Sequence, residues 1–117
     1  MNNNVSKMVL TIVFLIFGSG AFAADAWVSG KITQTLVTDN SHGKCMIFLP
    51  NFANFSNCPA QWITLDCAGS FGPKEDARRL WDTAQMAYAL DSSVDVYVTD
   101  SYKHNGYCKV NMIVVRK

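Results

Sequence analysis

The chain has 117 residues, half of them hydrophobic, and its ten lysines and arginines nearly balance its nine aspartates and glutamates. A chain of this length forms one small domain with a modest core. Its balanced charge lacks the basic clusters with which proteins bind nucleic acids or acidic membranes, so the composition excludes nucleic acid as the main partner.

The N-terminal segment has the pattern of a secretory signal peptide. Lys7 precedes an apolar run over 8–17, which is too short to span a bilayer as a helix, and 21–23 reads A-x-A, as at a cleavage site. We therefore expect a signal peptide at 1–23 and a mature domain at 24–117. The mature domain would be secreted or periplasmic, without membrane insertion after cleavage. An uncleaved membrane anchor is the alternative.

All four cysteines fall in the predicted exported domain: Cys45, Cys58, Cys67 and Cys108. An even number of cysteines in a small exported domain indicates disulfides. Their spacing lacks both the paired C-x2–4-C pattern of zinc sites and the C-x-x-C pattern of redox enzymes. We therefore expect structural disulfides, with no metal and no cofactor.

The first half of the mature chain predicts three strands. Alternating β-branched residues favour a first strand over 27–38, followed by a turn cluster at 39–43. A second strand is predicted over 44–49. A loop at 51–57 then leads to a third strand over 61–67.

The hydrophobic period changes after the third strand. Apolar residues at three- and four-residue spacing predict a helix over 74–90, and Pro73 suits its first turn. Alternating valines predict a fourth strand over 94–99. A turn-rich loop at 100–106 then precedes a last strand over 108–116.

The predicted order, with one helix between the third and fourth of five strands, is typical of an OB-fold, a small mainly β barrel. The rival is an open α+β sheet packed on one helix. Pairing of the second and third strands would set Cys45 opposite Cys67, and Cys58 would then join Cys108. Four cysteines allow three pairings, and the sequence leaves the choice open.

No arrangement of residues predicts catalysis. The only histidines, His42 and His104, both lie in turn-rich loops. Asp100 and Ser101 are near His104, but no strained nucleophile turn accompanies them, as a hydrolase triad would require. The sequence predicts no catalytic residue, and we expect that the protein is not an enzyme.

Three aromatic residues, Trp27, Trp62 and Tyr97, lie on the side of their predicted strands opposite to the core. Such rings either pack beneath a loop or helix, or stack on a sugar or fill a subunit interface. Ser29, close to Trp27, carries a hydroxyl that can hydrogen-bond a sugar hydroxyl or a carboxylate.

Several short motifs occur in a fixed order along the mature chain. They are S-G-K-I-T-Q at 29–34, Cys45 in the second strand, Cys58 ahead of a tryptophan-bearing third strand, the helix at 77–89 and the valine-rich 94–98. In this order and spacing the chain resembles the B-subunit family of subtilase cytotoxin and typhoid toxin over most of its mature length.

The resemblance implies an OB-fold protomer, a homopentameric ring, recognition of sialylated host-cell glycans and a companion toxin A subunit. The family serine that matches Ser29 contacts the sugar, so we expect a glycan-binding site at Ser29, with Trp27 beside it. The family tyrosine on the fourth strand aligns near Val98 here, and the family's C-terminal cysteine pair is absent. The second hypothesis is therefore a periplasmic or secreted protein-interaction or self-associating factor without glycan binding.

Overall fold

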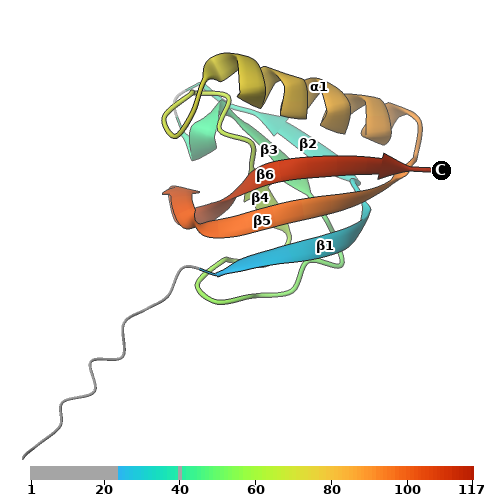
Figure 1. Ribbon diagram of the computed structural model, residues 1–117, viewed down its shortest axis with the longest axis horizontal. Coiled ribbons are helices and arrows are strands. Elements are labelled where there is room, and N and C mark those ends of the chain that lie inside the picture. Colours follow the sequence, from blue (N-terminus) through green and yellow to red (C-terminus); the bar gives the residue numbers. More distant parts are fainter. Residues whose placement is uncertain (1–23, 40) are drawn as a thin grey trace, which may run out of the picture.

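The computed structural model describes residues 24–39 and 41–117, so the predicted signal peptide lies outside the described residues. The described part is mainly β, with six strands, one α-helix and a short 3-10 helix (Figure 1). The strands are β1 (Asp25–Lys31), β2 (Gln34–Val37), β3 (Cys45–Phe48), β4 (Trp62–Thr64), β5 (Ser93–His104) and β6 (Tyr107–Arg116). The helices are η1 (His42–Lys44) and α1 (Lys74–Ala89).

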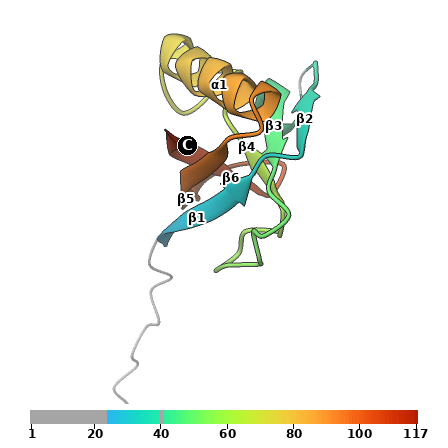
Figure 2. The same ribbon diagram turned by 90° about the vertical axis from the view of Figure 1, so that its right-hand side faces the viewer.

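The six strands form one mixed sheet in the order β1-β5-β6-β4-β3-β2. The pairing of β4 with β6 is parallel, and the other pairings are antiparallel. The two edge strands, β1 and β2, are consecutive in the chain and are joined by Ile32 and Thr33 alone. The sheet therefore curves until its two edges meet at this link, without being closed by pairing between them (Figure 2).

The structure corrects two of the predicted strands in the first half of the chain. The strand predicted over 27–38 is divided into β1 and β2 at the buried Ile32. The strand predicted over 61–67 is only the three-residue β4, because Gln61 and Asp66, on either side of it, have positive φ angles of 74° and 58°. Backbone in this left-handed region does not continue a strand.

The predicted loop at 100–106 is wrong, because most of it belongs to a hairpin. β5 continues to His104, and β6 begins at Tyr107 after the two residues Asn105 and Gly106. These two have φ angles of 50° and 84°. Asn-Gly with two positive φ angles is the favoured connection of a two-residue hairpin.

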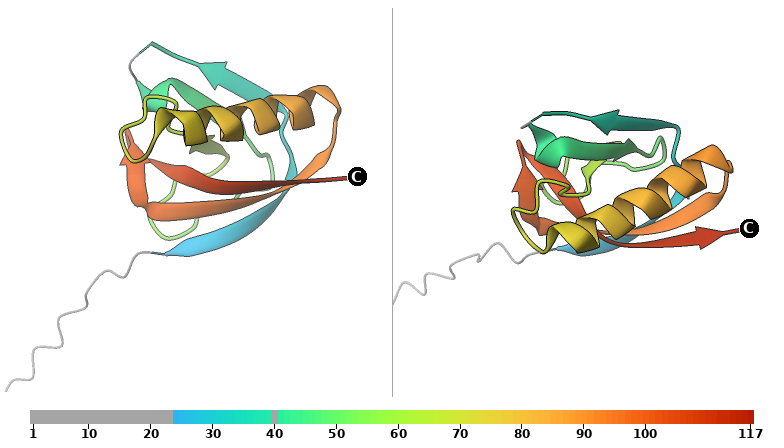
Figure 3. Two further views of the ribbon diagram at one scale, coloured as in Figure 1. Left: turned by 45° about the horizontal axis from the view of Figure 1, so that its top comes forward. Right: turned by 90° about the horizontal axis from the view of Figure 1, so that it is seen from above.

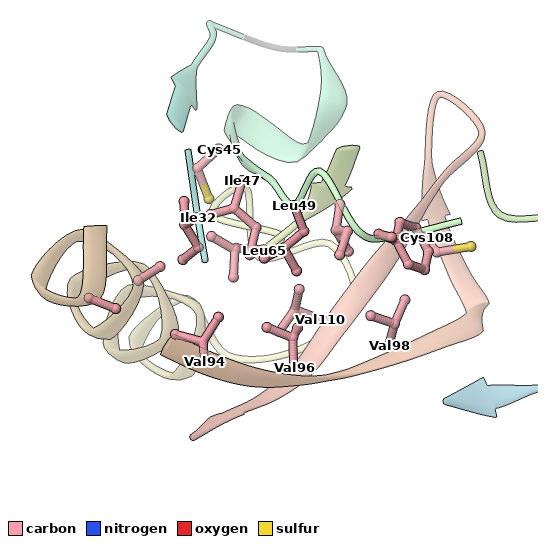
Figure 4. Packing of buried hydrophobic residues seen from close by; sticks show 14 of the residues in the cluster. Ile32, Cys45, Ile47, Leu49, Leu65, Val94, Val96, Val98, Cys108 and Val110 are labelled. Atoms are coloured by element: carbon pink, nitrogen blue, oxygen red, sulfur yellow. The ribbon is translucent and has the colours of Figure 1, made fainter. Parts of the chain in front are cut away.

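Buried side chains of the strands meet inside the curved sheet (Figure 4). Val94, Val96 and Val98 of β5 face Ile47 and Leu49 from the β3 region, and all five are fully buried. The alternation of valines predicted for 94–99 is thus confirmed as the core face of β5.

The helix predicted over 74–90 is confirmed as α1, which lies along one side of the sheet (Figure 3). Its buried positions are small: Ala77, Ala84 and Ala87. Small side chains let the helix axis approach the sheet, while Leu80 and Trp81 pack against the edge of the core.

The structure selects one of the three cysteine pairings. Cys45 is bonded to Cys67 and Cys58 to Cys108, with Cα–Cα distances of 5.6 and 5.5 Å. These distances are ordinary for disulfides, which are typical of proteins from oxidising compartments. Within 24–39 and 41–117, none of the helices has the length and apolar character needed to cross a membrane.

Candidate functional site

The outward face of β1 carries the two residues predicted to bind a sugar. Trp27 stands opposite Tyr97 of β5, and Ser29 stands opposite Asp95. The rings of Trp27 and Tyr97 have centroids 5.0 Å apart and are inclined by 52°. Trp27 keeps 53% of its surface exposed, so it is accessible to a ligand.

The hydroxyl of Ser29 is fixed by its neighbours. Its Oγ donates a hydrogen bond to Oδ1 of Asp95 at 2.5 Å, and Nη2 of Arg116 lies 2.9 Å from the same oxygen. The serine proton is therefore committed, while the oxygen retains lone pairs. In this arrangement Ser29 can accept a hydrogen bond from a ligand hydroxyl, and a carboxylate would have to compete with Asp95.

Tyr97 is held in the same row. Its phenol donates to Oδ2 of Asp25 at 3.1 Å. This hydrogen bond, followed by slight burial and the charge of Asp25, raises the pKa of the Tyr97 phenol above its ordinary value. The phenol stays neutral at physiological pH and keeps the tyrosine ring beside Trp27.

A hollow of about 360 Å³ lies between β1 and the loop that follows β3. It is lined by 26–29 on one side and by 51–55 on the other, so Trp27 and Ser29 share it with Asn51 and Asn54. The structure thus brings the two predicted residues together in one cavity.

The backbone of β1 adds further hydrogen-bonding groups. The N–H of Asp100 donates to the carbonyl of Ala24 at 3.0 Å, which makes these two residues a hydrogen-bonded pair. Hydrogen-bonded pairs alternate along antiparallel strands. The N–H and C=O groups of Trp27 and Ser29 therefore point away from β5, toward the edge of the sheet where the hollow lies.

Sequence reasoning missed four residues of this region: Asn51, Asn54, Asp95 and Arg116. The two asparagines are distant from β1 in the sequence, and no local pattern connects them to it. The strand alternation does contain a signal for Asp95, because Asp95 and Tyr97 occupy the outward positions between the buried valines.

The other residues considered from the sequence have structural partners. Trp62 is half-buried and meets the ring of Phe48 edge-on at 5.0 Å, which is the packed arrangement. Nε2 of His104 lies 2.5 Å from the buried carboxylate of Asp66. Asp100, the carboxylate near His104 in the sequence, instead accepts a hydrogen bond from Ser56.

Among the residues that the structure describes, no group of three or more histidine, cysteine, aspartate and glutamate side chains is arranged to hold a metal ion. Comparison with protein-family models, curated proteins and solved structures finds no match for this chain.

Proposed function

We propose that this protein is an exported bacterial binding module that recognises a host-cell glycan in the hollow beside β1. The observation that carries the proposal is that four residues with ring, hydroxyl or amide side chains line one cavity: Trp27, Ser29, Asn51 and Asn54. An aromatic face packs on the apolar face of a sugar, and amides and hydroxyl oxygens bond its hydroxyl groups. The volume of about 360 Å³ suits one sugar residue of a longer chain.

The proposal includes an OB-fold barrel in which β1 and β2 are the two halves of one bent first strand. It is supported by the order of the sheet, which begins with β1 and ends with β2, and by the place of α1 between β4 and β5. OB-folds bind oligosaccharides as well as oligonucleotides. A homopentamer with a companion toxin A subunit follows from the resemblance of the sequence to toxin B subunits and belongs to the same proposal.

A glycan array probed with residues 24–117 tests the binding site. The wild type is expected to bind a defined set of glycans, and Ser29→Ala and Trp27→Ala are each expected to weaken binding at least about tenfold. Ser101→Ala and Tyr102→Ala are matched controls, because both residues are exposed but lie outside the hollow. The controls should bind like the wild type.

The array has two outcomes that contradict the proposal. Absence of binding to any glycan would exclude glycan recognition, and equal binding by Ser29→Ala would exclude this site. Ser29 could contact the sugar directly, or it could act only by holding Asp95 in place. Arg116→Gln distinguishes these two roles, because Arg116 also holds Asp95. Losing the arginine should reduce binding less than losing the serine, because Ser29 still donates to Asp95.

A protein-interaction or self-associating factor is the second candidate, favoured by the exposed apolar face over β1, β5 and β6. Trp27, Met112 and Val114 on this face are 53%, 46% and 45% exposed. Exposed apolar surface of this kind is characteristic of protein contacts. Native mass spectrometry of the wild type and of Met112→Asp tests it. A strict monomer would contradict both self-association and the pentamer.

A further inference from the structure

A second cavity, of about 310 Å³, lies where the start of α1 meets the segment between β2 and β3. We propose that this cavity binds a small organic anion, a ligand with one flat apolar ring and one phosphate or sulfate group. The proposal goes beyond the glycan site, because the two cavities share no residue.

The charge of the cavity is one-sided. Lys44, Lys74 and Arg78 line it, and none of its lining residues is acidic. Arg78 has only a loose, exposed pair with Asp82 at 3.9 Å. Three like charges around one cavity repel one another, and a dianion bound among them would remove that repulsion.

The backbone holds Lys44 at the rim of the cavity. Lys44 has a φ angle of 73°, directly after His42 and Gly43 at 57° and 74°. This left-handed conformation is unfavourable for a residue with a side chain. Two hydrogen bonds maintain it: the N–H of Lys44 donates to Ser41 at 3.0 Å, and its carbonyl accepts from Thr38 at 2.8 Å. Strained backbone of this kind is concentrated at functional sites.

Lys74 is positioned by a glycine. The stem of Lys74 crosses Gly69 so closely that a methyl group at Gly69 would overlap Cγ of the lysine. Gly69 also has a positive φ angle of 70°. The glycine therefore provides the space in which the lysine stem lies, and Lys74 is one of the residues that line the cavity.

The apolar part of the lining includes the half-buried Trp81 and the Cys45–Cys67 disulfide. A cavity of about 310 Å³ is at the small end of the range for ligand sites, so its occupant has about one ring. The guanidinium of Arg78 matches the oxygen pairs of a phosphate or sulfate, which explains the preference for that head group.

Phenyl phosphate is the probe that tests the site, titrated into ¹⁵N-labelled protein of residues 24–117. Its binding should shift the indole N–H signal of Trp81 and the amide signals of Thr38 and Lys44. Phenol lacks the charged group and inorganic phosphate lacks the ring, so each should bind at least about tenfold more weakly. Phenyl sulfate, which carries one negative charge fewer than phenyl phosphate, should bind less tightly than phenyl phosphate but more tightly than phenol.

Charge variants distinguish a site from general attraction. The triple variant Lys44→Gln, Lys74→Gln, Arg78→Gln should weaken phenyl phosphate at least about tenfold. A control triple variant with the same loss of charge, Lys31→Gln, Lys103→Gln, Lys117→Gln, should bind like the wild type, because these residues lie outside the cavity. Arg78→Gln alone, an exposed change, should weaken binding about threefold and keeps the test valid if the triple variant does not fold.

Three results would overturn the proposal. One is the absence of a shift at Trp81 up to about 20 mM phenyl phosphate. Another is an equal loss of affinity in the control triple variant. The third is an acidic peptide that binds here while phenyl phosphate does not, which would assign the surface to a protein partner. Since glycan binding is measured at other residues, either proposal can fail without the other.

Discussion

Gly43 lies in a turn where the neighbouring side chains leave no room for a Cβ atom. A methyl group added there would lie 2.5 Å from Cδ2 of His104 and nearer still to Oγ1 of Thr64, and its φ angle is 74°. Gly106 in the β5–β6 hairpin has a similar φ angle of 84° but no atom within 4 Å of the same added group. The two glycines therefore share a backbone conformation and differ in their surroundings.

Gly43→Ala is expected to lower the free energy of unfolding by about 3 kcal/mol or more, because strain and overlap add. Gly106→Ala should lower the free energy of unfolding by about 1 kcal/mol, through backbone strain alone. Urea unfolding of both variants measures the difference. Equal losses would show that the side chains of Thr64 and His104 move aside freely, contrary to the packing described.

The hydrogen bonds of the Asp100 carboxylate should make the stability of the protein depend on pH. Its carboxylate accepts hydrogen bonds from Oγ of Ser56 and from the backbone nitrogen of Ala24, both at 2.6 Å. These bonds, the serine first, lower the pKa of Asp100 below its ordinary value. A carboxyl group with a depressed folded-state pKa stabilises the protein above its unfolded pKa of about 4, and this contribution is lost as pH falls through the folded pKa.

Asp100→Asn should therefore lower the melting temperature at pH 7, and its difference from the wild type should shrink as pH falls below about 4. Thermal unfolding from pH 2 to 7 measures this. Asp82→Asn is the control, since its carboxylate is exposed and only loosely paired with Arg78. A difference for Asp100→Asn that is constant with pH would exclude the charge as its cause.

Much of the candidate site could be predicted from single residues, and part of it could not. Trp27 and Ser29 were predictable because period-two alternation puts them on the outward face of a strand. Asn51 and Asn54 could not be predicted, because their loop lies against β1 only after the chain between them has folded. The commitment of the Ser29 proton to Asp95 required the register of β1 against β5.

At the scale of elements, α1 and the alternating valines of β5 followed from hydrophobic period alone. The division between β1 and β2 did not, because Ile32 continues the local β pattern and only its burial bends the chain there. The length of β5 was missed for another reason. Its residues after Thr99 are polar and pair with β6 beyond an irregularity between Thr99 and Lys103, although Asn105-Gly106 is a recognisable hairpin signal.

The buried face of α1 consists of alanines, so a larger side chain there should destabilise the protein. Ala84 is fully buried where the helix meets the core, so Ala84→Leu should cost about 1–3 kcal/mol of unfolding free energy through overpacking. Ala89, exposed at the end of the same helix, is the matched control, and Ala89→Leu should change stability by less than about 0.5 kcal/mol. Guanidinium unfolding compares them. A tolerated leucine at 84 would mean that α1 is not closely seated.

For the whole molecule, the two disulfides make loops of different size. Cys45–Cys67 spans 22 residues of sequence and Cys58–Cys108 spans 50. In the chain-entropy description, removing either should cost about 3–4 kcal/mol, with the larger cost for the longer loop. Urea midpoints of the two double alanine variants measure this. A larger cost for the shorter loop would show that cavity size around the cysteines outweighs chain entropy.

The two proposed binding cavities lie on different sides of the molecule. β1 and α1 are on opposite sides of the curved sheet (Figure 1), and each cavity adjoins one of them. The fold therefore separates the proposed glycan site from the proposed anion site, so the two ligands would not touch.

The contact between Ala24 and Asp100 would change its character if the chain is cleaved before Ala24, as the sequence predicts. In the uncleaved chain, the nitrogen of Ala24 is an uncharged amide that donates one hydrogen bond to the carboxylate. After the predicted cleavage before Ala24, the same nitrogen is the terminal ammonium group, and the contact becomes an ion pair. Cleavage would then strengthen the attachment of Ala24, the residue before β1, to β5, at the edge of the sheet that borders the proposed glycan site.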